Sequence, residues 1–211
     1  MFIDIYDEQM HLLGKASLEQ AHHEGLWHRV FHCWIVKPGK DGNHKVWLQL
    51  RSKEKPNSPN LLGVSAAGHL ESGETARDGI KDIEKELGLS VDFSRLTKLF
   101  TDRRVTDRQD YHNREFNPTY VLETEAKLED LTLLPGEVDG VYVAKIDDVA
   151  DLFKGKCDSI ASIGRIRLDD GSYKSEIRYV EAKDFVAADK AYYIKVMDML
   201  QRYCDNCGKV S

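Results

Sequence analysis

The sequence predicts an α/β fold, and three patterns in the chain support that prediction. Residues 26–36 and 45–51 are rich in aromatic and β-branched side chains and flank a glycine-containing turn at 39–42, which is typical of a β-hairpin. Residues 76–87 have apolar side chains at helical spacing, which indicates a helix with one face in a core. Residues 186–204 predict a long amphipathic helix near the C-terminus.

The remaining elements follow from shorter runs between turn residues. Residues 17–24 predict a brief helix that Gly25 ends, and residues 147–154 predict a second short helix. A charged loop rich in arginine is expected at 101–115, between two strands. Further strands are expected at residues 2–6, 61–65, 96–100, 116–123 and 138–146.

The chain continues past residue 155 with a segment that we expect to pack on the domain before it. Two strand-like runs, 160–168 and 173–180, flank an Asp-Gly pair, which is a favoured hairpin turn. The apolar face of the C-terminal helix is expected to pack on the sheet or on a second subunit, so a homodimer is one alternative. We therefore divide the chain into a domain at 1–155 and a C-terminal hairpin and helix at 156–211.

Length and composition limit the class of protein. With 211 residues and a formal net charge of −6, the chain is long enough for one ordinary domain, or one domain with an appendage. The acidic balance argues against a nucleic-acid polymer as partner, because a grip on its backbone requires a basic surface. The sequence has no long apolar run and no signal-peptide pattern, so we expect a soluble, cytoplasmic protein without a membrane partner. The four cysteines are too few and too scattered for a disulfide framework.

The predicted helix at 76–87 follows a loop that contains Gly68 and Gly73, and its charged residues are the most informative in the chain. Thr75 followed by Asp78 is a capping-box pattern that predicts the helix start at Thr75, and Gly88 is placed to end the helix in the left-handed conformation. Asp78, Asp82 and Glu86 stand four residues apart and should line one face. Like charges at this spacing repel unless a cation lies among them, and Mg2+ prefers oxygen ligands. The alternative is a solvated acidic face.

This stretch resembles the Nudix box, whose pattern is Gly-x5-Glu-x7-Arg-Glu-U-x-Glu-Glu-x-Gly-U, with U an apolar residue. Gly68, Gly73 and Glu74 fall in register with the loop of that pattern. Alignment from Gly88 places Glu86 on one of the metal-binding acids of the family. The resemblance implies the Nudix fold, a mixed β-sheet sandwiched between helices. It also implies hydrolysis of a small-molecule diphosphate with Mg2+ or Mn2+.

The roles that the resemblance implies transfer residue by residue. Glu86 and Asp82 are expected to hold the catalytic metal. Lys81 takes the position of the family's arginine and is expected to face the substrate. Gly68 would let the loop backbone come close to the substrate, and Glu74 is expected to brace that loop.

The helix departs from the family pattern at two points. The interval from Glu74 to Gly88 is one residue shorter, and Lys85 stands where the pattern has an acidic residue. A lysine at this position puts a cation where the family has an anion. A protein that keeps the pocket for binding, without turnover, is therefore an alternative to a hydrolase.

Motifs outside the box resemble the branch of the family related to isopentenyl-diphosphate isomerase. They are Gly-Leu-Trp-His-Arg at 25–29, Leu-Gln-Leu-Arg-Ser at 48–52 and Ser-Ala-Ala-Gly-His at 65–69. True isomerases have a catalytic cysteine just before the Gly-His of the box, whereas this chain has Ala67 there. Because the thiol is missing, we prefer a hydrolase on an isomerase-like frame, with an isomerase as the alternative.

The isomerase resemblance also implies a second metal site. His28, His69 and Glu115 fall at positions of metal ligands in that branch. The first upstream histidine of the branch falls on Ala21, with His22 adjacent, and its other glutamate is an asparagine here. Two histidines and a carboxylate would suit a transition metal. The alternative is that the histidines make hydrogen bonds within the core.

Two loop or strand-end residues complete the candidate site. Glu137 lies in a loop before a late strand, where several Nudix enzymes place a second acid, so it is either a general base or a solvated acid. Arg51 is a candidate phosphate ligand, because guanidinium groups pair with phosphate oxygens bidentately. The arginines of the charged loop alternate with aspartates, which we interpret as a self-neutralised surface. They include Arg103, Arg104 and Arg108.

Overall fold

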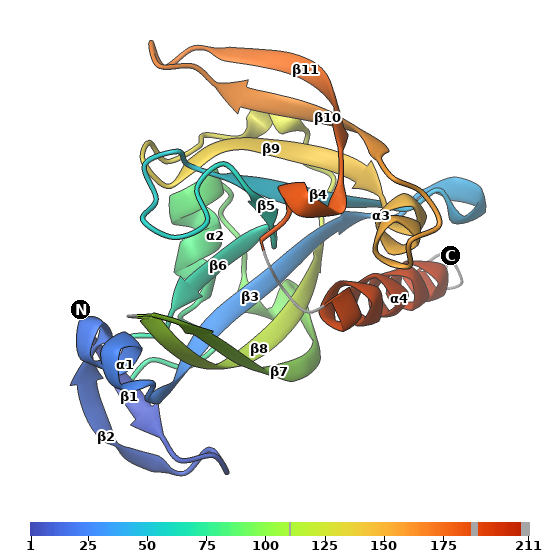
Figure 1. The fold of residues 1–211 in the computed structure, drawn as a ribbon. Coiled ribbons are helices and arrows are strands. Elements are labelled where there is room, and N and C mark those ends of the chain that lie inside the picture. The colour runs from blue at the N-terminus through green and yellow to red at the C-terminus, as the bar shows by residue number, and fades with distance from the viewer. Residues whose placement is uncertain (110, 187–189, 208–211) are drawn as a thin grey trace.

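The computed structural model describes residues 1–109, 111–186 and 190–207, and its centre is an 11-stranded sheet (Figure 1). The strands are β1 (Phe2–Tyr6), β2 (Leu12–Ser17), β3 (Trp27–Lys37), β4 (Lys45–Arg51), β5 (Leu62–Gly63), β6 (Ala66–His69), β7 (Leu96–Arg108), β8 (Tyr111–Glu123), β9 (Val138–Lys145), β10 (Ile160–Arg167) and β11 (Tyr173–Val180). The helices are α1 (Leu18–Glu24), α2 (Ile80–Leu87), α3 (Ile146–Phe153) and α4 (Lys190–Cys207).

The central strand is β3, which pairs with β1, β4, β6 and β8 at different points along its length. Its pairing with β8 is parallel, whereas its other three pairings are antiparallel. From β4 the sheet continues through β9 and β10 to β11. The predicted α/β class and the mixed sheet are therefore confirmed.

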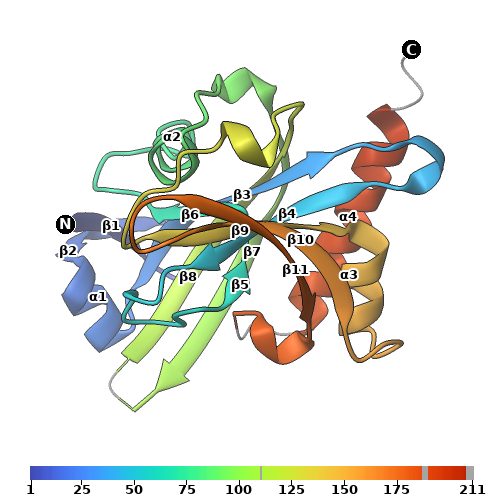
Figure 2. The same cartoon turned by 90° about the horizontal axis from the view of Figure 1, so that it is seen from above.

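Helices cover both faces of the sheet, as Figure 2 shows. On one face lies α2, whose Ile83 and Leu87 pack in a cluster with Ile35 of β3. On the other face lie α3 and α4, where Leu200 shares a cluster with Trp34. Successive residues of a strand point to opposite faces, so the unbroken apolar run of β3 supplies side chains to both cores.

The segment expected to be a charged loop is the largest difference from the sequence prediction. Strands β7 and β8 continue through it as a long antiparallel hairpin, in which Arg104 lies opposite Glu115. Along β7, Arg103 is exposed and Arg104 is partly buried, because neighbouring strand residues face opposite sides. The interpretation of these arginines as one surface loop is therefore wrong.

Helix α2 begins later than the capping pattern predicts. Its first residue is Ile80, preceded by Gly79 without a side-chain cap. The backbone N–H and the hydroxyl of Thr75 both donate to Asp78 Oδ2 at 2.8 Å, so these two residues close a turn before the helix. Asp78 is therefore not part of the acidic helix face. The other end is as predicted, since Gly88 ends the helix with a φ of 73°.

Two short strands are absent from the sequence prediction. One is β2, which pairs with β1, and the other is β6, which pairs with β3. The strand expected at 61–65 is reduced to β5. The pairing of β6 bears on the site, because it sets Ala67, Gly68 and His69 beside the central strand.

The C-terminal segment forms the predicted hairpin and helix. Strands β10 and β11 pair in antiparallel register, and β10 also pairs with β9. Of the helix expected at 186–204, residues 187–189 lie outside the described part of the chain, and α4 begins at Lys190. Buried residues of α4 share a core with β3, β4 and α3. Among the helices described, none is long and apolar enough to cross a membrane.

Candidate active site

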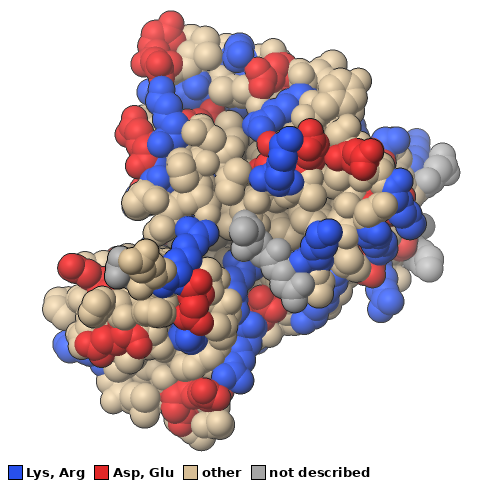
Figure 3. Space-filling model, viewed as in Figure 1, with Lys and Arg blue, Asp and Glu red and all other residues tan. Residues whose placement is uncertain are grey.

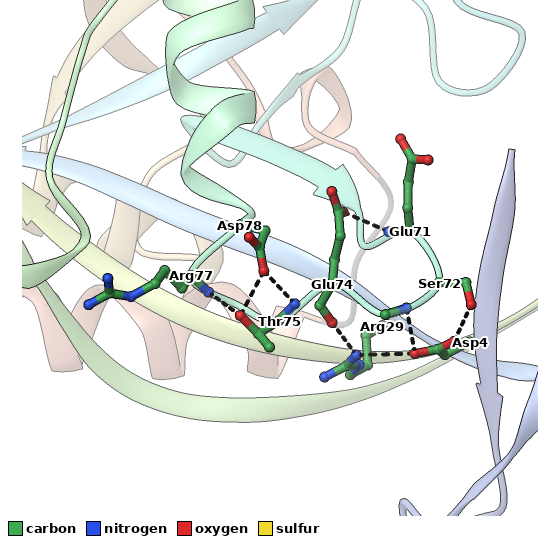
Figure 4. Close-up of polar contacts among 9 residues, drawn as sticks. Asp4, Arg29, Glu71, Ser72, Glu74, Thr75, Arg77 and Asp78 are labelled. Atoms are coloured by element: carbon green, nitrogen blue, oxygen red, sulfur yellow. Dashed lines mark hydrogen bonds and ion pairs between the residues drawn. The ribbon is translucent and has the colours of Figure 1, made fainter.

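The loop between β6 and α2 is held by side chains from β1 and β3 (Figure 4). Asp4 of β1 accepts hydrogen bonds from Ser72 Oγ at 2.7 Å and from the backbone N–H of Gly73 at 3.1 Å. Arg29 of β3 donates to the backbone oxygen of Glu74 at 2.6 Å and lies 3.7 Å from the Asp4 carboxylate. The first strand and the central strand together fix the position from which the chain enters α2.

Glu74 stabilises the same loop through its carboxylate. Its Oε2 accepts the backbone N–H of Glu71 at 2.8 Å, and its Oε1 pairs with the ammonium group of Lys81. Lys81 also lies 3.6 Å from the carboxylate of Glu71. Lys81 therefore lines the cavity with its charge already balanced by two loop carboxylates.

Gly68 lies directly against Asp82, the first acid of α2. A Cβ at residue 68 would collide with the carboxylate of Asp82. The Oδ2 atom of that carboxylate is buried and has no hydrogen-bond partner among the residues described. Burial raises the pKa of Asp82 to about 6, against the opposing charges of Lys81 and Lys85.

Glu86 lies one helical turn after Asp82 and lines the same cavity. Its Oε2 accepts hydrogen bonds from Gln49 Nε2 at 2.8 Å and from the backbone N–H of Ala67 at 3.4 Å. Burial raises the pKa of Glu86 to about 7; the hydrogen bond from Gln49 opposes this shift and the Asp82 carboxylate adds to it. Two neighbouring carboxylates whose charged forms are disfavoured by burial form a donor set that suits a hard dication.

Glu137 and Arg51 also line the cavity, and each has a partner in the structure. Glu137 forms an ion pair with Lys55, and its negative charge contributes to the raised pKa values of both acids of α2. Arg51 donates to the backbone oxygens of Asn57 at 2.8 Å and Ser58 at 3.1 Å. Arg51 therefore holds the loop that follows β4.

Three histidines form a cluster at another part of the cavity, where His22 and His69 line its wall and His28 lies behind them. His22 of α1, His28 of β3 and His69 of β6 place one ligand nitrogen each within 4.8 Å of one another. The Nε2 atom of each is buried and has no hydrogen-bond partner in the described part of the chain. The Nδ1 atom of His28 lies 2.8 Å from the carbonyl oxygen of Leu26, to which it donates, and this leaves the Nε2 lone pair free.

Burial keeps these imidazoles neutral. It lowers the pKa of His22 to about 4 and that of His69 to about 3, and it also lowers the pKa of His28. Neutral imidazole is the form that binds metal ions. Three such groups with free nitrogen atoms fit a transition metal.

Strand register explains why the cluster forms. The parallel pairing of β3 with β8 sets His28 beside Glu115, and the pairing of β3 with β6 sets His69 beside Val30. These residues share one face of the sheet, and His22 approaches from α1. Sequence reasoning brought together His28, His69 and Glu115, and the structure adds His22 to them.

Glu115 is buried beside the histidines, with both oxygens hydrogen-bonded. Asn113 Nδ2 donates to Oε1 at 2.6 Å, and Asn117 Nδ2 donates to Oε2 at 3.1 Å. Burial disfavours the charged carboxylate, but the positive charge of Arg104 and the hydrogen bond from Asn113 help to outweigh it and lower the pKa of Glu115 to about 2. Glu115 thus supplies negative charge next to neutral imidazoles.

A single cavity of about 760 Å3 joins the acids of α2 to the histidine cluster. Figure 3 shows the molecule hollowed between the lobe of β1, β2 and α1 and the part that carries β9–β11. A cavity of this volume suits a small organic molecule. Its basic lining residues are Arg51, Lys55, Lys81, Lys85, Arg104 and Arg108.

Sequence reasoning misses four residues of this cavity as site residues. His22 carries a signal, because it is adjacent to the position where the isomerase branch has a histidine. Gln49 and Tyr192 resemble ordinary strand and helix residues, and only the packing of the sheet and α4 brings them to the cavity. Arg104 is hidden among alternating charges whose strand character is not apparent in the sequence.

No family model matches the chain. An uncharacterised Nudix hydrolase of Clostridium acetobutylicum is 32% identical over 200 residues, which is 94% of this chain and 96% of that protein. An uncharacterised Nudix hydrolase of Listeria monocytogenes is 30% identical over 146 residues, which is 67% of this chain and 79% of that protein.

Solved structures show a similar fold. The structure of DR0079 from Deinococcus radiodurans has a TM-score of 0.53 and 19% identity, over 74% of this chain and 90% of that chain. A MutT/nudix family protein from Enterococcus faecalis has a TM-score of 0.50 and 14% identity, over 84% of this chain and 62% of that chain. The relative from Clostridium matches nearly the whole length of both proteins, and so this chain belongs to the Nudix hydrolase family.

Proposed function

We propose that this protein hydrolyses a small-molecule diphosphate linked to an organic moiety, and that it requires Mg2+ or Mn2+ held by Glu86 and Asp82. The observation that supports this best is a pair of partly buried carboxylates, one helical turn apart on α2, that line the cavity and have raised pKa values. Such a pair gains more from a dication than exposed carboxylates do. Membership of the family supports hydrolysis, and the cavity volume supports a small substrate.

The residues around the acids have roles consistent with this chemistry. A divalent metal at Glu86 and Asp82 would offset negative charge on the phosphate oxygens. Glycine at position 68 keeps room for the Asp82 carboxylate against the loop backbone. We assign Glu137 as the general base, with Lys55 holding its carboxylate in place. Arg51 and Lys81 place positive charge along the cavity, where the phosphates of the substrate would lie.

A phosphate-release assay tests the proposal. The full chain is incubated with a panel of nucleoside and isoprenoid diphosphates, with Mg2+ and with a chelator. We expect hydrolysis of at least one compound, only with the metal. Glu86→Gln should abolish this activity, because a neutral amide is a poor ligand for a hard dication.

Glu84→Gln is the matched control, because Glu84 is an exposed glutamate of the same helix. We expect this variant to keep its activity. Near-normal turnover by the Glu86→Gln variant would contradict the metal assignment. Binding of a diphosphate without any hydrolysis would instead favour the binding-protein alternative.

The histidine cluster favours a second candidate function, an isomerase-like enzyme with a transition metal. We propose that His22, His28 and His69 hold this metal, with Glu115 beside them. Calorimetry with Zn2+ tests the site: we expect one equivalent of Zn2+ to bind at the histidines, and His69→Ala to remove it. Since Ala67 replaces the thiol, we expect no dimethylallyl product from isopentenyl diphosphate, and its detection would favour this second function.

A further inference from the structure

Arg104 lies on the wall of the cavity that β7 and β8 form. It is opposite Glu115 in the antiparallel hairpin, so the two side chains lie on the same face. Thr106 and Asn113, the pair two residues further along the hairpin, lie on that face as well, and all four residues line the cavity. The wall is therefore polar, although a strand face that is turned inward is usually apolar.

The guanidinium group of Arg104 is held in position, but it has no hydrogen-bond acceptor among the residues that the structure describes. Its Cζ lies 4.7 Å from the centre of the Tyr192 ring of α4. The Tyr192 hydroxyl is in turn fixed by His32 Nδ1 at 3.1 Å and by Trp34 Nε1 at 3.4 Å. Both oxygens of Glu115 are bonded to asparagine side chains instead. Within the described part of the chain, the Arg104 side chain makes no hydrogen bond or ion pair, and the negative charges of Glu115 and Asp102 act on it only through space.

Other cations of the cavity differ from Arg104. Lys55 pairs with Glu137, and Lys81 pairs with carboxylates of the loop before α2, while Arg51 donates to backbone oxygens. Lys85 and Arg108, for which no partner is recorded among the residues described, are exposed to solvent. Arg104 is partly buried, and a guanidinium removed from water loses the partners that water supplied. Its five N–H donors are therefore available to a ligand in the cavity.

We propose that Arg104 is an anion-binding residue of this cavity, and that it binds phosphate oxygens of the diphosphate group of the substrate. Guanidinium groups bind phosphate through two parallel hydrogen bonds, which a stacked and immobilised side chain can form at low entropic cost. The inference rests on the proposed function for the identity of the ligand. It also gives α4 a part in the site, because Tyr192 supports the guanidinium from beyond residue 155.

Arg103 offers a matched control on the same strand. It is also stacked on an aromatic ring, with its Cζ 4.4 Å from the centre of Trp27, and it pairs with Glu8 at 2.9 Å. Arg103 is not one of the described residues that line the cavity. Arg103→Gln and Arg104→Gln therefore remove the same charge from adjacent residues that face opposite sides.

The test is calorimetric titration of the full chain with inorganic pyrophosphate in the presence of Mg2+. We expect Arg104→Gln to weaken binding by about ten- to a hundred-fold, the loss typical of hydrogen bonds to a charged group. Arg104→Lys should lose part of the affinity, because an ammonium group keeps the charge without the fork. Arg103→Gln should bind as the unaltered protein does. Circular dichroism checks that each variant folds, and Arg104→Lys serves if the glutamine variant does not.

Two results would overturn the proposal. The first is an equal affinity for pyrophosphate in the Arg104→Gln variant and the unaltered protein, which would show that Arg104 does not bind the anion. If Zn2+ binding fell in that variant at the same time, the role of Arg104 would be limited to supporting Glu115. Equal losses in the Arg103 and Arg104 variants would show a general effect of charge. The proposed function is tested separately. If pyrophosphate binding depends on Arg104 but no diphosphate is hydrolysed, the anion-binding role of Arg104 is supported and the hydrolase function is contradicted.

Discussion

Lys85 is the residue of α2 that most directly opposes a cation at the acidic pair. It is exposed at the edge of the cavity and adjacent in sequence to Glu86. Its charge counteracts the raised pKa of Asp82, so the two side chains interact electrostatically. A long lysine side chain can also extend its ammonium group into water, which limits its effect on a bound metal.

We predict that Lys85→Glu tightens Mg2+ binding by about threefold to tenfold, the effect expected of partly screened charges. Hydrolysis should rise with it, because the substitution restores the acidic residue of the family pattern. Calorimetric titration with Mg2+ measures the change, and Lys98→Glu, at an exposed position of β7, controls for net charge. Equal Mg2+ affinities in the lysine and glutamate forms would show that Lys85 points away from the metal.

Gly68 is required by contact rather than by backbone conformation. We predict that Gly68→Ala destabilises the protein by about 1–3 kcal/mol, the usual cost of overpacking, because its Cβ would collide with the Asp82 carboxylate. Chemical unfolding measures this cost. In an Asp82→Ala background the carboxylate is gone, so Gly68→Ala should then cost little. An equal cost in both backgrounds would mean that the methyl group collides with something else.

At the scale of elements, apolar periodicity predicts those parts of the fold that face a core. The hairpin of β3 and β4, helix α2 and the hairpin of β10 and β11 all have such patterns, and the structure contains each of them. The middle of β7 has instead arginine and aspartate residues, because its inward face lines a polar cavity. Periodicity of apolar residues cannot reveal a strand whose buried side is polar.

The start of α2 shows a second limit of local patterns. The backbone N–H of Thr75 donates to the Asp78 carboxylate, which is one of the two hydrogen bonds of a capping box. The helix nevertheless begins only at Ile80. The position of the loop is set by Asp4, which is distant in the sequence, so its hydrogen bonds cannot be inferred from the box alone.

We predict that Asp4→Ala loosens the loop and destabilises the protein by about 1–3 kcal/mol, because the donors of Ser72 and Gly73 lose their acceptor. Hydrogen exchange at the Gly73 amide should accelerate, and Mg2+ affinity should fall. Asp7→Ala is the control, since among the residues described the Asp7 carboxylate accepts hydrogen bonds only within its own turn, from Gln9 and His11. Unchanged exchange at Gly73 in the Asp4 variant would refute the role of β1.

At the scale of the whole molecule, the cavity combines parts of the chain that the sequence keeps far apart. Family resemblance predicts Asp82, Glu86, His28, His69 and Glu115 as site residues, and all but His28 line the one cavity, with His28 in contact through the histidine cluster. The contribution of α4 could not be predicted. The amphipathic pattern predicts that this helix packs on the sheet or on a second subunit, but it does not specify which strands the helix covers or that Tyr192 reaches the cavity.

The same packing buries His32 against Tyr192, and this predicts a pH dependence of folding. Burial lowers the pKa of His32 to about 3, whereas the ordinary value is 6.5. Below about pH 6.5 the unfolded chain binds a proton at this residue that the folded chain does not bind. The contribution of His32 to stability is therefore fully present above pH 6.5 and is lost as the pH falls toward 3.

His32→Gln removes this titration and should make the pH dependence shallower. We expect the free energy of unfolding of the unaltered protein, relative to the variant, to fall by about 1.4 kcal/mol for each pH unit below 6.5. Urea unfolding of both forms between about pH 7.5 and about pH 5 measures the difference. Parallel curves would contradict the prediction, because they would mean that His32 takes up its proton equally well in the folded protein. Tyr192→Phe separates burial from hydrogen bonding: it removes the hydroxyl next to His32 Nδ1 and leaves the ring, so the slope should persist if burial is the cause.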